Sequence, residues 1–192
     1  GYNNTASDVN STVGGGVDNI TSAANAVVAG GATNTASAIG TTISGGGSNI
    51  ANAMFSTVGG GVSNSVSGTN STISGGCTNI ASGNFSTIGG GWLNTASGTC
   101  STVGGGYSNI SNTVASTVSG GSQNTASGYY PFIGSGFQNN ASGVASVVVG
   151  GGLNDATVSN ATIVGGNNNT ASGTYSIVGA GKNNTAAGTY SV

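Results

Sequence analysis

The chain has 192 residues, of which 39 are glycine and only 2% are charged, and it contains no histidine. An ordinary soluble domain has roughly a quarter of charged residues. The charged residues here are scattered along the chain: Asp8, Asp18, Asp155 and Lys182. Acid–base catalysis and phosphate binding therefore lack the side chains that they need, so we expect no enzyme, no cofactor, no metal site and no nucleic-acid partner.

A repeat of fifteen residues runs through the chain without insertion or deletion. Counted from Ser11, a typical unit is 86–100, which reads Ser-Thr-Ile-Gly-Gly-Gly-Trp-Leu-Asn-Thr-Ala-Ser-Gly-Thr-Cys. We number the positions of each unit from one to fifteen. Such a fixed period is typical of a solenoid, in which each unit is one coil that cannot fold alone. We expect a single β-solenoid repeat domain over residues 1–192, with about thirteen coils.

Positions one to three alternate like a short strand with one buried face. The third position is always Val or Ile: Val13, Val28, Ile43, Val58, Ile73, Ile88, Val103, Val118, Ile133, Val148, Ile163 and Val178. The sixth position is always Gly, and Gly is frequent at the thirteenth. Because Gly reaches positive φ without penalty, we expect sharp corners at two places in each unit. One is the pair of residues at positions five and six, as at Gly90 and Gly91, and the other is position thirteen.

The ninth position is always Asn. Asn tolerates the left-handed conformation and can bond its own turn, and stacked Asn side chains can hydrogen-bond along a column. We therefore expect a structural asparagine ladder of Asn4, Asn19, Asn34, Asn49, Asn64, Asn79, Asn94, Asn109, Asn124, Asn139, Asn154, Asn169 and Asn184.

The eleventh position is Ala in ten of thirteen units. A small residue opposite the Val/Ile column fits the narrow interior of a short coil. The chain is thus predicted to be an all-β, parallel β-solenoid, either a β-roll or a β-helix, with two or three short strands per coil and neighbouring coils ~4.8 Å apart.

Most aromatic residues fall in two columns that border predicted corners. The seventh position holds Tyr2, Trp92, Tyr107 and Phe137, and the fifteenth holds Phe55, Phe85, Tyr130, Tyr175 and Tyr190. They are candidates for sugar stacking or for lateral contact between copies, and the alternative is that corners simply tolerate bulk.

Two further columns bear on the surface. Thr fills the second position in eight of thirteen units, which suits ice binding or a plain polar outer surface. The tenth position is Ile in alternate early units, at Ile20, Ile50, Ile80 and Ile110. If Ala at the eleventh position points inward, these Ile side chains point outward and form a candidate lateral interface. Pro131 and Ser135 mark one irregular coil, an edge contact or a bend.

Glycosylation acceptor sequences occur about as often as this composition produces by chance. The candidates are Asn3, Asn10, Asn19, Asn70, Asn84, Asn109, Asn140, Asn160, Asn168 and Asn183. Cys77 and Cys100 are the only cysteines, and their spacing favours two buried or half-buried free thiols over a zinc site.

The motif Ala-Ser-Gly-x-x-Ser recurs at 81–86, 96–101 and 171–176. Followed by Val or Ile and Gly, it resembles the head repeats of YadA-like trimeric autotransporter adhesins. That resemblance implies a left-handed parallel β-roll, trimeric assembly and surface adhesion. The period here is fifteen residues rather than about fourteen, and the asparagine column is a further departure.

Together these features predict a structural protein that forms an extracellular filament or surface appendage from copies of itself. We expect the terminal coils to be uncapped, so that copies stack end to end. The alternatives are an ice-binding solenoid and a carbohydrate-binding adhesin or viral fibre segment, for which glycans would be partners. No apolar run approaches the ~20 residues of a membrane span, so no membrane insertion is expected in this segment.

Overall fold

The computed structural model describes residues 1–192 as stacked coils of short parallel strands and turns, without any helix. The predicted all-β parallel β-solenoid with a period of fifteen residues is confirmed. The chain forms two compact units, residues 1–97 and residues 98–192. Both units are built from the same kind of coil.

Each full coil contributes two strands of two residues. The first unit contains β1 (Thr5–Ala6), β2 (Thr12–Val13), β3 (Ile20–Thr21), β4 (Val27–Val28), β5 (Thr35–Ala36), β6 (Thr42–Ile43), β7 (Ile50–Ala51), β8 (Thr57–Val58), β9 (Ser65–Val66), β10 (Thr72–Ile73), β11 (Ile80–Ala81), β12 (Thr87–Ile88) and β13 (Thr95–Ala96). The second contains β14 (Thr102–Val103), β15 (Ile110–Ser111), β16 (Thr117–Val118), β17 (Thr125–Ala126), β18 (Phe132–Ile133), β19 (Asn140–Ala141), β20 (Val147–Val148), β21 (Asp155–Ala156), β22 (Thr162–Ile163), β23 (Thr170–Ala171), β24 (Ile177–Val178) and β25 (Thr185–Ala186).

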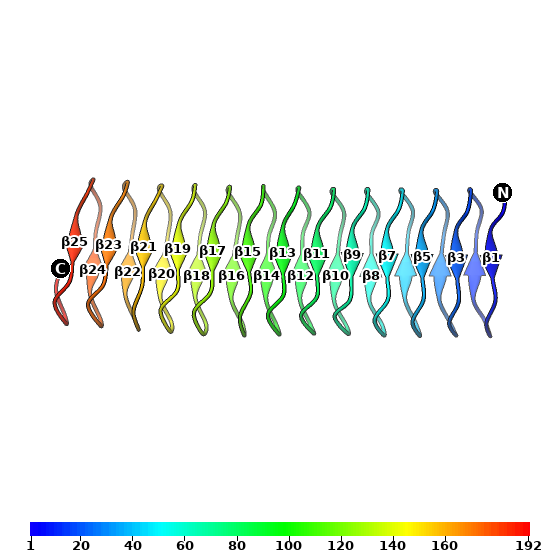
Figure 1. Ribbon diagram of the computed structural model, residues 1–192, viewed down its shortest axis with the longest axis horizontal. Helices are drawn as coiled ribbons and strands as arrows, with labels where there is room; N and C mark the ends of the chain where they lie inside the picture. Colours follow the sequence, from blue (N-terminus) through cyan, green and yellow to red (C-terminus); the bar gives the residue numbers. More distant parts are fainter. The chain divides into compact units, whose positions relative to one another are not determined.

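Strands pair in parallel with the strand two places along the chain, at an offset of one repeat. Thr72 of β10 lies opposite Thr87 of β12, for example. Within each unit the odd-numbered strands form one sheet and the even-numbered strands form the other (Figure 1). A third column of isolated parallel bridges joins the seventh positions, as between Val62 and Cys77. Each coil therefore has two strands and one isolated bridge, which agrees with the predicted two or three short strands per coil.

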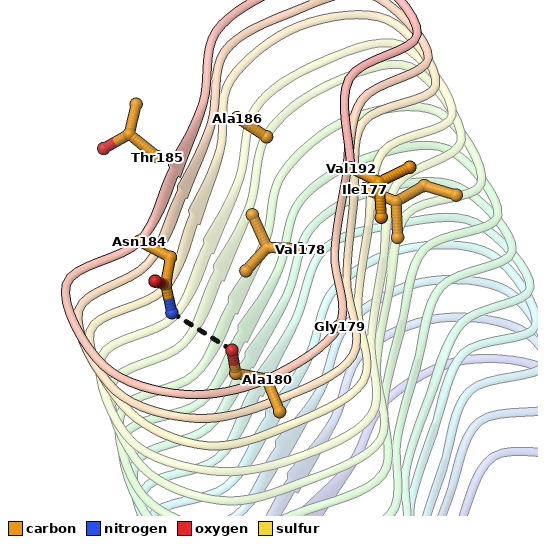
Figure 2. Close-up of a pocket in the computed structure, with 8 residues that line it drawn as sticks. All are labelled: Ile177, Val178, Gly179, Ala180, Asn184, Thr185, Ala186 and Val192. Carbon is orange, nitrogen blue, oxygen red and sulfur yellow. Dashed lines mark hydrogen bonds between the residues drawn. The ribbon is translucent and has the colours of Figure 1, made fainter.

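The core lies between the two sheets and consists of the second residue of each strand. Ile73 and Ala81 are both fully buried, and the same positions are buried along the stack, apart from Ala6 and Val13 at its start. Figure 2 shows the arrangement in the last coil, where Val178 and Ala186 point into the coil and Thr185 points away. The predicted ladder of Val/Ile facing Ala is confirmed.

Polar side chains also line the interior, which the repeat pattern did not predict. The first position of most coils is a buried Ser, such as Ser71 and Ser86. The Ser71 hydroxyl donates to the carbonyl of Gly83 at 2.6 Å and accepts the Ser86 N–H at 2.9 Å. At the same position, the hydroxyls of Ser56, Ser101, Ser146 and Ser176 are buried without a hydrogen-bond partner.

Positive φ occurs at positions six, eight and fifteen throughout the chain, and at position five in Gly45, Gly60, Gly90 and Gly105. The sixth is the predicted glycine corner, as at Gly76 with φ of 89°. The prediction of a corner with positive φ at position thirteen is wrong, because the glycines there do not have positive φ. These glycines approach the next coil closely instead: a Cβ on Gly128 would lie 2.0 Å from the carbonyl oxygen of Gly143. Positions eight and fifteen hold mostly residues other than Gly, such as Leu93 and Phe85.

The left-handed residues link each coil to both of its neighbours. At position seven, the Cys77 N–H donates forward to Gly91 in the next coil, whereas the left-handed Thr78 donates its N–H back to Val62 in the previous coil. The left-handed conformation reverses the direction of the peptide group. Its cost of about 1–2 kcal/mol is comparable to the ~0.5–1.5 kcal/mol that one hydrogen bond contributes.

The coil that contains Pro131 keeps its strand in register, since Phe132 lies opposite Val147. In neighbouring coils the N–H of position one closes the turn, as Ser146 does to Gly143 at 3.2 Å. Proline has no N–H, so this turn lacks that bond, yet the Pro131 carbonyl still accepts from Thr117 at 3.0 Å. The expected irregularity is therefore confined to the turn and does not bend the sheet.

Two adjacent glycines provide a test of this account. A Cβ at Gly76 would lie 2.2 Å from the carbonyl oxygen of Gly91 and would have a φ of 89°, whereas a Cβ at Gly75 would meet nothing within 4 Å. We expect Gly76→Ala to lower the free energy of unfolding by at least about 2 kcal/mol and Gly75→Ala to change it by less than about 0.5 kcal/mol. Urea denaturation followed by far-UV circular dichroism measures both. Equal effects of the two substitutions would contradict the assignment of corners.

Candidate functional site

The asparagine column is the most extensively bonded set of side chains in the molecule. Its members are buried throughout each unit, apart from Asn4 and Asn184 in the first and last coils. They lie on the inner side of the coil, just before the odd-numbered strands. This column is therefore part of the interior and not of the surface.

Asn79 illustrates the bonds that this side chain makes. Its Nδ2 donates to Asn64 Oδ1 in the previous coil at 3.1 Å, to the Gly75 carbonyl in its own coil at 3.1 Å and to the Gly91 carbonyl in the next coil at 2.9 Å. Its Oδ1 accepts the backbone N–H and the side-chain Nδ2 of Asn94, at 3.0 and 3.1 Å. One amide group thus connects three successive coils.

The chemistry of this position explains why the residue is Asn. The site requires a donor with two protons and an acceptor, at the reach of a two-carbon side chain, and only Asn supplies both. Asn tolerates the left-handed conformation, but the column does not use it. The positive φ lies one residue earlier, at Thr78 with φ of 55°.

The structure divides the candidate glycosylation sites into two classes. Asn19 and Asn109 are 0% exposed and belong to the buried column. The others are exposed or half-buried on the turns or the outer strand face: Asn3, Asn10, Asn70, Asn84, Asn140, Asn160, Asn168 and Asn183. Several of these pair with their equivalents, as Asn168 Nδ2 does with Asn183 Oδ1 at 2.9 Å.

All nine candidate aromatic residues are exposed on the surface. The two columns lie at different turns of the coil, so the structure does not bring them together into one site. The fifteenth-position members have φ near 57°, which is the left-handed region. Tyr175 and Tyr190 stack with their ring centroids 5.3 Å apart, and the ring of Phe55 lies over Gly40 in the previous coil.

The threonine column forms a continuous row on the even-numbered sheet of the first unit. Thr42, Thr57, Thr72 and Thr87 stand in register on β6, β8, β10 and β12. All four point out of the coil and are half-buried or exposed by their neighbours. The row is uncharged and flat.

The alternate isoleucines lie on the opposite sheet. Ile20, Ile50 and Ile80 are 40%, 41% and 43% exposed, whereas the alanines that follow Ile50 and Ile80 are buried. The predicted outward orientation of this column is confirmed. Thr or Ser occupies the coils between them, so the exposed apolar side chains are separated from one another by polar ones.

In the second unit, only half of the second positions that lie on strands are Thr, at Thr102, Thr117 and Thr162, and the others are apolar. Phe132 and Ile177 are exposed, and Val147 is half-buried. They all belong to one sheet, on β18, β20 and β24. The first unit has one apolar residue at this position, Val27 on β4.

The two thiols are not equivalent. Cys77 is half-buried and Cys100 is exposed, so the prediction of burial is wrong for Cys100. Its position, the fifteenth, is the left-handed turn residue, with φ of 57°.

Nowhere do three His, Cys, Asp or Glu side chains gather as metal ligands would. The structure has no helix with the length and apolar character of a membrane span.

Replacement of the buried amide by a carboxylate tests the asparagine column. Asn79→Asp keeps the shape of the side chain but replaces the Nδ2 amino group by a carboxylate oxygen. That oxygen faces three hydrogen-bond acceptors, so the substitution buries a negative charge without a partner. We expect the free energy of unfolding at neutral pH to fall by about 3–5 kcal/mol, whereas Asn70→Asp on the exposed turn changes it little.

The pH dependence of Asn79→Asp follows from the same burial. The folded state raises the pKa of the introduced carboxyl above its unfolded value, so stability is retained at pH below the unfolded pKa and is lost as pH rises through the folded pKa. Thermal melts of both variants at several pH values measure this. A deficit in Asn79→Asp that does not shrink toward acid pH would contradict the bonding described.

Comparison with known proteins adds no family to this description. No protein-family model matches the chain, and no curated protein matches it significantly. The geometry therefore stands on its own: a parallel β-solenoid whose fifteen-residue coil is held by a buried asparagine column, with distinct rows of side chains on its outer faces.

Proposed function

We propose that the chain is a structural repeat segment of an extracellular filament or cell-surface appendage. One observation carries the proposal: each coil is bonded to its neighbours at the strands, at the turns and in the interior. In one coil, Thr72 donates its N–H to Ser86, Thr78 donates to Val62, and Asn79 bonds in both directions. Load along the stack is shared by many parallel bonds, which suits a spacer or fibre.

The composition supports an extracellular location. The chain has one Lys and no Arg, so trypsin-like proteases have a single cleavage point, Lys182. The backbone N–H groups of the turns are hydrogen-bonded between coils, which keeps the chain out of the extended conformation that proteases bind. Such resistance is useful to a protein that must persist outside the cell.

The resemblance to YadA-like adhesin heads supports the same role. Those repeats belong to surface appendages, and the shared Ala-Ser-Gly-x-x-Ser motif here spans the turn between the two strands. Trimeric assembly and adhesion come to this chain only as part of the proposal. The Asn at position nine of every coil distinguishes this chain from those repeats.

Ice binding is the second candidate, and the threonine row favours it. Four register-matched Thr residues on a flat, uncharged sheet resemble a regular array of hydroxyl and methyl groups. Thr102 and Thr117 on β14 and β16 are also in register, but Val27 on β4 and Phe132 on β18 replace Thr, so the array is short.

Carbohydrate binding is the third candidate, supported by the exposed rings of Trp92 and its column. The rings lie at two separate turns, so a glycan would contact one column at a time.

Assembly of the purified full chain tests the proposal. We expect filaments by electron microscopy, with a ~4.8 Å repeat in fibre diffraction from aligned material. Chains that stay monomeric at high concentration would overturn it.

Ice-shaping and glycan-array assays of the same material separate the rivals. Thermal hysteresis that is lost in Thr57→Tyr and kept in the odd-sheet variant Thr95→Tyr would replace the proposal with ice binding. Glycan binding that is lost in Trp92→Ala would replace it with adhesion to carbohydrate.

A further inference from the structure

One sheet face of the second unit carries a cluster of exposed apolar side chains. We define the apolar face as Phe132, Val147, Val149, Val164 and Ile177, which occupy outward positions two and four along β18, β20, β22 and β24. Val149 and Val164 are 47% and 50% exposed. The Phe132 ring lies over position four of its own coil, since a Cβ on Gly134 would be 3.6 Å from its Cε1. Tyr129 and Val144, also exposed, precede these strands.

The fold itself does not require apolar residues at these positions. In the first unit, the equivalent second positions of β6, β8, β10 and β12 are all Thr. The equivalent fourth positions are Ser44, Gly59, Ser74 and Gly89. The same coil therefore forms with a polar outer face, and the apolar residues in the second unit add exposed hydrophobic surface without filling the core. A contiguous exposed apolar patch is typical of a binding surface.

The chemistry of the face identifies its partner. The only charged residues in 98–192 are Asp155 and Lys182, and neither is on this sheet. Two identical uncharged faces can meet without like-charge repulsion, whereas a charged partner would gain nothing here. The side chains also repeat at the coil spacing of ~4.8 Å, and another copy of this sheet presents the same spacing.

The area is consistent with a pair of copies. Aromatic side chains bury roughly 150–250 Å² each and Val and Ile bury less, so these seven partly exposed side chains offer on the order of 500 Å² per copy. Two copies would bury about 1,000 Å², the minimum area expected of a biological interface. Contacts of this size are weak singly and become strong when repeated along an assembly.

We infer that the even-numbered sheet of residues 129–178 is a lateral interface that packs face to face against the same sheet of a second copy of this chain. The inference rests on the proposed structural role and adds the surface through which copies associate side by side. Sheets pack at ~10 Å, which leaves room for interdigitated Val and Phe side chains.

The test replaces the face by the residues that the first unit uses. The variant Phe132→Thr/Val149→Ser/Val164→Ser is compared with a matched control on the other sheet, Ile20→Thr/Ile50→Thr/Ile80→Thr, which removes three apolar side chains of similar exposure. Sedimentation velocity over a wide range of concentration measures self-association of the full chain, and circular dichroism verifies folding. We expect the association constant to fall at least about tenfold in the face variant and to stay within about twofold in the control.

A second measurement does not depend on apolar substitutions. In a Cys77→Ser/Cys100→Ser background, Thr162→Cys on β22 should form disulfide-linked dimers on mild oxidation, whereas Thr125→Cys on the odd-numbered β17 should not. Equal cross-linking at both positions would overturn the inference.

Electron microscopy distinguishes the two proposals. Single filaments of the face variant beside paired or bundled wild-type filaments support both. Bundles that persist in the face variant overturn the lateral interface and leave the structural role intact. If the wild type forms no filaments but the Thr162→Cys variant still forms disulfide-linked dimers, the structural role is overturned and the lateral interface is supported.

Discussion

The amide of the ninth residue is the constraint on which the rest of the coil depends. Its Nδ2 contacts acceptors in the previous, the same and the next coil, as at Asn79. This geometry exists only if each coil brings an identical amide to the same height, one repeat later. An inserted or deleted residue would move one amide out of reach and leave several buried polar groups unsatisfied, each at a cost of about 1–3 kcal/mol. The strict period of fifteen residues follows from this.

The same constraint explains the size of the interior. Because the amide spans the inside of one turn, the opposite strand can contribute only a small or β-branched side chain. Ile73 packs beside Ala81, and buried Ser71 and Ser86 fill the narrow turn. The apolar core is thin for a chain of this length. The hydrogen-bonded columns therefore carry a larger share of the specificity than in an ordinary domain, where packing of large side chains defines the fold.

Residues that recur in all or most coils were the ones from which the fold could be predicted. Val or Ile at position three, Gly at six, Asn at nine and Ala at eleven mark the buried strand residues, one corner and the ladder. The other two left-handed positions could not be found in this way. Thr78, Phe85 and Leu93 share no chemistry, because the conformation is imposed by hydrogen bonds to the previous coil and not by the residue's own preference. The exposure of Cys100 was missed for the same reason.

The outward positions are then the place where this chain differs from coil to coil. Position two points away from the core in every coil, so its identity is not decided by packing: the fold accepts Thr72 and Phe132 equally well. Variation that the fold does not require reflects what the surface contacts. The run of Thr from Thr42 to Thr87 in the first unit and the apolar cluster around Phe132 and Val149 in the second give two chemically different surfaces on one repeated backbone. A repeat that is nearly uniform inside can therefore carry distinct contacts along its length, with no pocket and no charged group involved in either.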